Sequence, residues 1–279
     1  MTGTSGPAGH RSELADLLGG HQIVDLSLPL AEDLPCHWST HQRFQHKIWN
    51  WFTDRHTVAG DVYSRGGPYA TRWLLIDEHT GTHMDAPSHF VPPPESGLPD
   101  AGPAGAIAVA DVDPAQLTGP AAVITVQEPA SGQPGISPLI EPDTVLDWEK
   151  ANGRLSGGDV VLFHTGWDRR YLPGADGAGY LDEVVVTGRA PGWPAPSVDT
   201  MELLMAREVR CVGTDAPSMG PAQDARSVHI AGLRTGAVYV ECLSRLAALP
   251  ATGALFCFLP LRLTGGTGSP GRAIAFVRR

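Results

Sequence analysis

The sequence is short of positive charge, and of charge in general. Its 279 residues include 20 Lys and Arg against 30 Asp and Glu, which gives a formal net charge of −10, and only 18% of the residues are charged. Nucleic acids and anionic membranes are bound through basic surfaces, so neither is an expected partner. The 42% of hydrophobic residues instead indicates a chain with a substantial buried core.

Cysteines and long apolar runs are also scarce. The four cysteines form no C-x-x-C pair and no disulfide-framework spacing, which favours free thiols in a reducing compartment. No apolar run approaches the ~18 residues of a membrane span, and the first residues lack the pattern of a signal peptide. We therefore expect a cytoplasmic protein that binds no membrane and acts on a small molecule.

Glycine and proline punctuate the chain without forming a repeat. We expect residues 1–20 to be a flexible N-terminal tail and residues 21–279 to be a single domain. The β-prone segments are 23–28, 121–126, 158–167, 209–213, 254–263 and 273–278, and helical patterns cover 142–151 and 197–207. Because strands and helices alternate only loosely, the pattern predicts an α/β fold with a mixed sheet, not a doubly wound parallel one.

A cluster of potential metal ligands follows the β-prone segment 71–76. Four side chains stand at offsets 0, 4, 6 and 10 of one short segment: His79, His83, Asp85 and His89. Histidine nitrogen and carboxylate oxygen are common ligands of zinc, manganese and iron(II). Gly81 and the Ala86-Pro87 pair disfavour a helix, which argues against the helical H-E-x-x-H site of zinc proteases. We expect a strand leading into a loop that bends the ligands around one point.

This segment resembles the signature of the bacterial kynurenine formamidase and cyclase family, which includes isatin hydrolase. The matching residues read His79-x-Gly81-Thr82-His83-x-Asp85-x-Pro87-x-His89-Phe90. The resemblance requires a further His and a Glu twelve residues apart, and the chain has His229 and Glu241 at this spacing. It covers roughly residues 22–278 and implies a swivelling β/β/α fold with a barrel-like mixed sheet, assembled as a homodimer or homotetramer.

The resemblance also implies a site for two divalent ions. His79, His83 and Asp85 would hold one ion, and His229 would hold the second, with Asp85 and Glu241 reaching both. Carboxylates have two oxygens and can bridge ions about 3.5–4 Å apart. Zinc is the expected metal and manganese the next candidate, because the ligand set mixes nitrogen and oxygen.

By resemblance, His89 is the catalytic residue that takes and returns a proton, although histidine chemistry also leaves open a role as a further ligand. The expected activity is metal-dependent hydrolysis of an amide, formamide, cyclic amide or lactone carbonyl on a small aromatic substrate. A cyclase or lyase of natural-product biosynthesis is the alternative. A binding module that kept the metal without turnover is a third possibility, and the complete set of site residues speaks against it.

Segment 35–69 is rich in aromatic and imidazole side chains and shows no period. Such a segment is suited to line the site of a flat substrate, to cover a subunit interface, or to pack on its own core. Trp38 is the candidate substrate-binding residue, by resemblance to family members that place an aromatic side chain near the metal. His164, at the end of segment 158–167, is either a pocket residue or a strand-end histidine. Asp215 is interpreted as a residue that braces a loop or supports the site from behind its ligands, without a metal role of its own.

Overall fold

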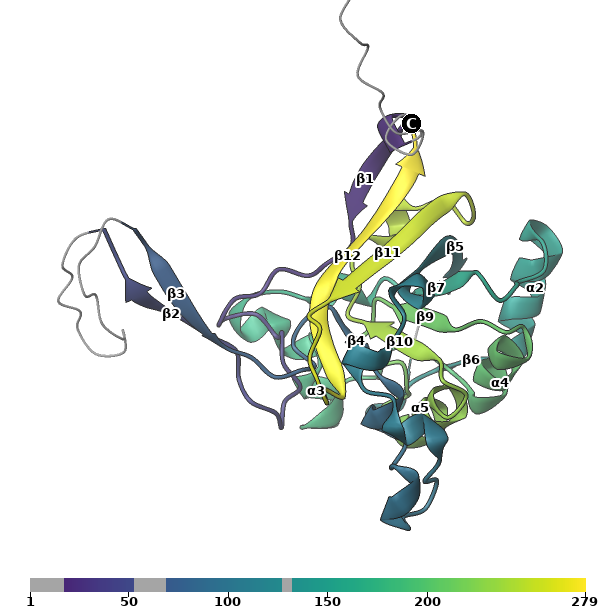
Figure 1. Ribbon diagram of the computed structural model, residues 1–279, viewed down its shortest axis with the longest axis horizontal. Helices are drawn as coiled ribbons and strands as arrows, with labels where there is room; N and C mark the ends of the chain where they lie inside the picture. The colour runs from purple at the N-terminus through teal and green to yellow at the C-terminus, as the bar shows by residue number, and fades with distance from the viewer. Residues whose placement is uncertain (1–17, 53–68, 127–131) are drawn as a thin grey trace, which may run out of the picture.

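The computed structural model describes residues 18–52, 69–126 and 132–279, and its centre is a closed mixed barrel (Figure 1). The main sheet has the order β1-β12-β11-β5-β7-β9-β10-β4, and β4 also pairs with β12. Its strands are β1 (His21–Asp25), β4 (His83–Asp85), β5 (Thr118–Thr125), β7 (Val160–His164), β9 (Cys211–Thr214), β10 (Val238–Glu241), β11 (Ala254–Pro260) and β12 (Gly268–Arg278). The extra pairing closes seven strands into a barrel and leaves β1 outside, on β12.

Strand β7 shows why the sheet has apolar packing on both faces. Val160 and Leu162 belong to the apolar cluster inside the barrel, and Val161 and Phe163 belong to the cluster between the sheet and the helices. All four side chains are at most 2% exposed. The strand pairs in parallel with β5 and β9, and parallel strands are usually covered on both sides. A continuous apolar run in the sequence therefore becomes a central strand.

Helices cover the outer face of the parallel strands (Figure 1): α2 (Pro142–Asn152), α4 (Val198–Ala206) and α5 (Ala225–Leu233). The short α3 (Asp182–Val185) packs in a separate apolar cluster. Helix α4 begins after Ser197, whose hydroxyl accepts a hydrogen bond from Thr200 N at 3.2 Å, as its N-cap position predicts. Among the residues described, no helix combines the length and apolar character needed to cross a bilayer.

Short elements connect these layers. The 3₁₀ helices are η1 (Pro87–His89), η2 (Pro94–Ser96), η3 (Pro103–Ala106), η4 (Val109–Asp111), η5 (Pro114–Leu117), η6 (Trp167–Arg170), η7 (Gly174–Tyr180) and η8 (Leu246–Ala248). Strands β6 (Leu139–Ile140) and β8 (Ala195–Pro196) form a separate parallel pair. Many of these connections begin at a proline, which fits the first position of a helix but not its interior.

A hairpin of β2 (Gln45–Asn50) and β3 (Thr71–Leu75) extends away from the barrel (Figure 1). This corrects two expectations. Segment 35–69 contains a strand where no period was visible, and β3 does not join the sheet that carries the metal ligands. The reason is that β2 and β3 are stabilised by pairing with each other, which a local pattern does not reveal. Residues 53–68 lie outside the described part, as do residues 1–17 of the predicted tail.

The predicted α/β fold with a mixed, barrel-like sheet is confirmed, although its closure was not visible in the sequence. Strand β12 begins at Gly268, ahead of the β-prone segment 273–278. Gly268, Ser269 and Pro270 pair with Asp85, Met84 and His83 of β4. This pairing gives the short β4 a neighbour on each side, because β10 pairs with its other edge.

Candidate metal centre

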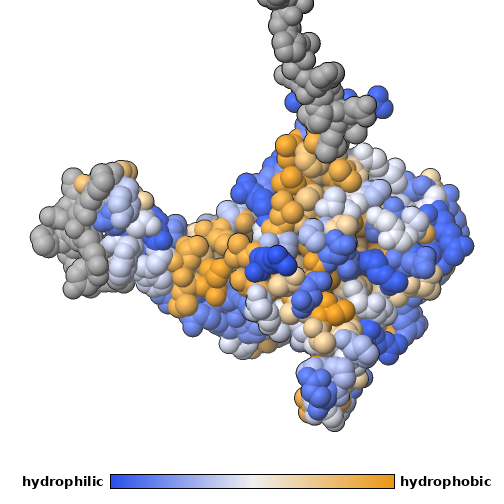
Figure 2. Space-filling view, in the orientation of Figure 1, coloured by the Kyte–Doolittle hydropathy of each residue, from blue (hydrophilic) through white to orange (hydrophobic). Residues whose placement is uncertain are grey.

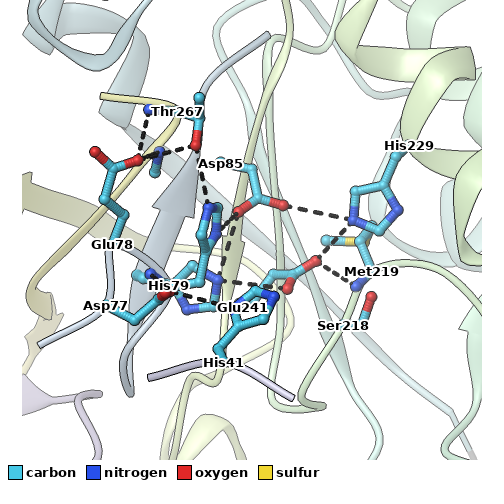
Figure 3. Close-up of polar contacts among 12 residues, drawn as sticks. His41, Asp77, Glu78, His79, Asp85, Ser218, Met219, His229, Glu241 and Thr267 are labelled. Carbon is cyan, nitrogen blue, oxygen red and sulfur yellow. Dashed lines mark hydrogen bonds and ion pairs between the residues drawn. The ribbon is translucent and has the colours of Figure 1, made fainter. Parts of the chain in front are cut away.

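The barrel brings together the five predicted ligands from four parts of the chain. His83 and Asp85 lie on β4, and Glu241 ends the neighbouring β10, where it pairs with His83. His229 reaches the same point from α5, and His79 from the turn before β4 (Figure 3). The ligands were expected in a loop after a strand; two of them are instead on a strand held from both edges.

Asp85 is central to the cluster. Its Oδ1 lies 2.9 Å from His79 Nδ1 and 3.4 Å from His83 Nε2, and its Oδ2 lies 3.4 Å from His229 Nε2. Glu241 stands opposite, with Oε1 3.2 Å from His229 Nε2 and Oε2 3.6 Å from His83 Nε2. Each carboxylate therefore faces more than one imidazole.

Main-chain carbonyls orient two of the histidines. His83 Nδ1 lies 2.7 Å from Gly81 O, and His229 Nδ1 lies 2.7 Å from Ala225 O, so each ring donates its Nδ1 proton to a carbonyl. In the neutral ring the remaining nitrogen, Nε2, then carries a lone pair and points at the carboxylates. Metal-bound histidines are held in this way, with one nitrogen on a fixed acceptor and the other on the ion.

His79 is oriented from the opposite side by Glu78 and Thr267 (Figure 3). Glu78 Oε2 accepts hydrogen bonds from Thr267 N at 2.8 Å and from Thr267 Oγ1 at 2.9 Å. Thr267 Oγ1 in turn lies 3.4 Å from His79 Nε2. This contact holds the opposite edge of the ring, so that Nδ1 faces Asp85 Oδ1 at 2.9 Å. Gly268 is required beside it, because a Cβ there would collide with the His79 ring.

The residues fit a divalent metal ion. Asp85 is fully buried, and its Oδ2 makes no hydrogen bond within the described residues, even though His229 Nε2 is 3.4 Å away. A buried carboxylate oxygen without a partner is costly, and a cation would satisfy it. Three histidine nitrogens and two carboxylates are a donor set that zinc or manganese accepts.

Charges within the cluster also favour a cation. Burial alone would lower the pKa of His229, but Asp85 and Glu241 raise it to about 10. Burial likewise opposes the charged form of His83, yet Asp85 holds the pKa of this ring well above its usual value. Despite its burial, the surrounding imidazoles, His89 first and then His229, keep the pKa of Asp85 well below its usual value. Protons bound to the imidazoles therefore balance the negative charge of the carboxylates. A divalent ion would take the place of these protons.

His89, on η1, stands beside His79. The two ring centroids are 4.0 Å apart at an interplanar angle of 31°, and potential ligand atoms of His79, Asp85 and His89 lie within 4.8 Å of one another. Burial lowers the pKa of His89 to about 3, so its ring is neutral and has a nitrogen lone pair. This position suits both roles left open above, proton transfer and metal ligation.

A cavity of about 230 Å³ opens over the cluster. Imidazoles and Glu241 form one part of its wall, and the other part is mainly apolar: Pro35, Cys36, Trp38, Phe90, Tyr180, Leu181 and Pro217. Trp38 thus lies where a substrate-binding residue should, with its ring edge-on to Trp193 at 6.4 Å. Its contact with substrate stays a prediction. A wall that is aromatic on one side and polar on the other suits a small aromatic compound.

The two remaining candidates lie away from this cavity. His164 ends β7, where its Nδ1 is 3.4 Å from Thr125 Oγ1, and it is not among the residues that line the cavity. Asp215 accepts hydrogen bonds from Thr165 N at 2.9 Å, Thr165 Oγ1 at 2.5 Å and Gly166 N at 2.8 Å. It holds the turn after β7, so its interpretation as a loop-bracing residue is confirmed.

Several contributors to the site were not found from the sequence. Met219 N donates to Glu241 Oε1 at 2.5 Å, and the Phe90 ring stacks on His229 at 4.2 Å and 24°. Phe90 belongs to the quoted signature, so its place near the ligands could have been suspected. Thr267 and Met219 carry no such signal, because they approach the site only through barrel closure and through the loop after β9.

Comparisons with known proteins agree on one family. The family model described as "Putative cyclase" matches residues 24–221. Isatin hydrolase of Roseibium aggregatum is 30% identical over 223 residues, 77% of this chain and 78% of that protein. Kynurenine formamidase of Salinibacter ruber is 31% identical over 208 residues, 72% of this chain and 77% of that protein. The solved isatin hydrolase A from Labrenzia aggregata, bound to benzyl benzoate, is 28% identical with a TM-score of 0.75, covering 96% of this chain and 100% of that one.

Replacement of Asp85 tests the metal centre directly. Protein purified without chelator should carry about one to two equivalents of a divalent metal. Asp85→Ala should lose most of it, because this carboxylate faces three imidazoles, whereas His164→Ala removes an imidazole outside the cluster and should keep it. Elemental analysis by mass spectrometry measures both. Wild-type stoichiometry in Asp85→Ala would show that Asp85 is not a ligand.

Proposed function

The chain belongs to the cyclase family, and from this premise we propose that it is a metal-dependent hydrolase that opens an amide, formamide, cyclic amide or lactone carbonyl of a small aromatic substrate. The observation that carries the proposal is the carboxylate pair, Asp85 and Glu241, facing three imidazoles at the floor of an aromatic-walled cavity. The names of the relatives, isatin hydrolase and kynurenine formamidase, both describe cleavage of a C–N bond next to an aromatic ring.

The proposed metal is zinc, with manganese next and two ions per site. When bound, the metal would activate water and polarise the carbonyl that is attacked. His79, His83 and Asp85 are proposed to hold one ion and His229 the other, with Asp85 and Glu241 reaching both. Contacts with Gly81 O, Ala225 O, Thr267 Oγ1 and Met219 N keep the three imidazoles and Glu241 oriented before substrate arrives.

His89 is proposed to move the proton. Its neutral ring stands at the cavity wall beside His79, where it can take a proton from the attacking water and return it to the leaving nitrogen. Trp38 and Phe90 on the same wall would hold a flat ring and exclude bulk water. The cleavage therefore needs no further acid or base from the chain.

A cyclase or lyase is the second candidate, because the description of the matching family names a cyclase. In addition, proton transfer by His89 does not itself require water as a reactant. The two activities differ in the origin of the product oxygen. Hydrolysis adds one oxygen atom from solvent to the acid product, and cyclisation adds none.

Turnover in ¹⁸O-labelled water separates the two candidates. Metal-loaded protein should convert an aryl formamide, isatin or an aryl lactone to an acid that contains one labelled oxygen, as detected by mass spectrometry. Asp85→Ala protein is the matched control and should add no label above the uncatalysed background. Conversion of a substrate without label in the product would support cyclisation and contradict the hydrolase.

Alanine at His89 should separate proton transfer from ligation. His89→Ala is expected to lower kcat by roughly 10²–10⁴, the usual contribution of general acid–base catalysis, while the metal content stays near the wild-type value. His83→Ala should instead lose metal and activity together. Metal analysis and steady-state kinetics on the same preparations give the answer. If His89→Ala loses metal as fully as His83→Ala, His89 is a ligand.

The hairpin supports a proposed homo-oligomer, a dimer or tetramer, in which it lies near a neighbouring active site. Two-stranded hairpins are marginally stable by themselves. This one extends from the barrel while Phe52, Tyr69 and Leu74 are 57%, 59% and 57% exposed. Figure 2 shows further apolar surface on the body next to the point where the hairpin leaves it. A second copy covering this surface would bury these side chains and hold the hairpin.

Light scattering on the purified protein tests this assembly. The mass should be at least twice the 29.5 kDa of one chain. Leu74→Lys should weaken the assembly, because it places a charge on the hairpin surface. Leu98→Lys, at a side chain that is also 58% exposed but lies outside the hairpin, should not. A monomeric wild type at working concentrations would contradict the assembly.

A further inference from the structure

His41 is an accessible polar side chain on the wall of the cavity, and it is neither a predicted ligand nor the proposed proton carrier. Its side chain is 38% exposed. The hydroxyl-bearing residues on the same wall are far less open, because Tyr180 is 1% exposed and Ser218 is 5% exposed. A compound that enters the cavity can therefore reach the imidazole of His41.

Two contacts hold His41 in place. Its main-chain N donates to Trp38 O at 2.9 Å, which closes a tight turn. Its Nδ1 lies 3.3 Å from Asp77 Oδ1 (Figure 3). Asp77 is itself fixed, since the same oxygen accepts a hydrogen bond from His79 N at 2.9 Å. The imidazole thus has a defined position between Trp38 and the turn that carries His79.

The contact with Asp77 determines what the other ring nitrogen of His41 can do. A carboxylate only accepts hydrogen bonds, so the proton of the neutral ring lies on Nδ1 and the lone pair on Nε2. Within the described part of the chain, Nε2 has no hydrogen-bond partner. A carboxylate that accepts one imidazole N–H also makes the other nitrogen more basic. Nε2 is therefore an oriented acceptor that is available to a ligand.

The position of His41 suits the nitrogen of an amide. When an amide carbonyl lies at the metal cluster, its N–H lies close by, because the carbonyl carbon carries both atoms. A hydrogen bond from this nitrogen spans about 3 Å. The His41 ring is at the corresponding place, with its centroid 6.3 Å from that of His79. The aromatic part of the substrate would then lie along Trp38, which the turn places next to His41.

We propose that His41 is a specificity-determining residue whose Nε2 accepts a hydrogen bond from the N–H of the substrate amide. The inference rests on the proposed function, since it assumes that the amide carbonyl is the group at the metal cluster. It narrows the substrate class to open-chain or cyclic amides that keep a hydrogen on nitrogen. N-alkyl amides and lactones are disfavoured, because they offer no donor to His41.

The energetic basis is the loss of a hydrogen bond. An N-methyl group would displace water from Nε2 without replacing its hydrogen bond, and a lactone would place its ring oxygen against the lone pair. A net hydrogen bond contributes about 0.5–1.5 kcal/mol, which is up to about tenfold in affinity. Because His41 is partly exposed, we expect this factor and not the much larger discrimination of a fully buried polar site.

Two histidine variants isolate the acceptor. His41→Phe removes both ring nitrogens and keeps a planar ring, and the main-chain bond to Trp38 stays. His164→Phe is the matched control, because it removes an imidazole that does not line the cavity. Neither residue is a predicted ligand, so elemental analysis should give wild-type metal content for both variants.

The test measures binding of oxindole and N-methyloxindole to zinc-loaded protein by calorimetry, at about pH 8.5 to keep the imidazole neutral. The two lactams differ only in the methyl group on nitrogen. Wild type should prefer oxindole by about tenfold. His41→Phe should weaken binding of oxindole by about the same factor and leave N-methyloxindole nearly unchanged. His164→Phe should keep the wild-type preference.

Three results would overturn the inference: wild type with no preference for oxindole, a preference that survives in His41→Phe, or an equal loss of both ligands in that variant. The readout is binding and is independent of turnover. If the preference depends on His41 while no labelled oxygen enters any product, the role of His41 stands and hydrolysis fails. If hydrolysis is observed without a His41-dependent preference, only the role of His41 fails.

Discussion

The arrangement of the site depends on one carboxylate, which is buried where the barrel closes. Asp85 sits on a three-residue strand that pairs with β10 on one edge and β12 on the other, and it is fully buried. A lone buried charge is prohibitively costly, so the surrounding chain must supply positive partners. His79, His83 and His229 lie at 2.9–3.4 Å from its two oxygens. The electrostatic requirement of one side chain thus places the others.

The supporting hydrogen bonds extend this requirement outward. His83 and His229 each donate one proton to a main-chain carbonyl. Thr267, itself hydrogen-bonded to Glu78, fixes the orientation of the His79 ring. The barrel interior and the helix-facing layer are filled by separate apolar clusters, so the open space lies at the ligand-bearing strand ends and not within the barrel. A packed barrel holds the donors still, and the loops over it shape the cavity.

Local patterns allowed much of the framework to be predicted. Strands β5, β7 and β9 could be predicted because buried parallel strands have continuous apolar sequences. Helices α2 and α4 could be predicted because α2 begins with a proline and α4 with an N-cap serine. The hairpin was missed in part, since β2 has no clear period and gains its order from pairing with β3. Thr267 was missed because it is 188 positions from His79 in the sequence. The two residues come into contact through a strand pairing that has no local sequence signal.

The sequence by itself determined the chemistry of the donor set. Residue type and close spacing specify nitrogen and oxygen donors, and the twelve-residue interval from His229 to Glu241 is short enough for one helix, turn and strand to bring both to the site. Tertiary structure alone decided which nitrogen of each ring faces Asp85 and the position of the His89 ring against His79. These depend on hydrogen-bond partners and packing neighbours that become adjacent only when the barrel closes, and sequence spacing carries no information about them.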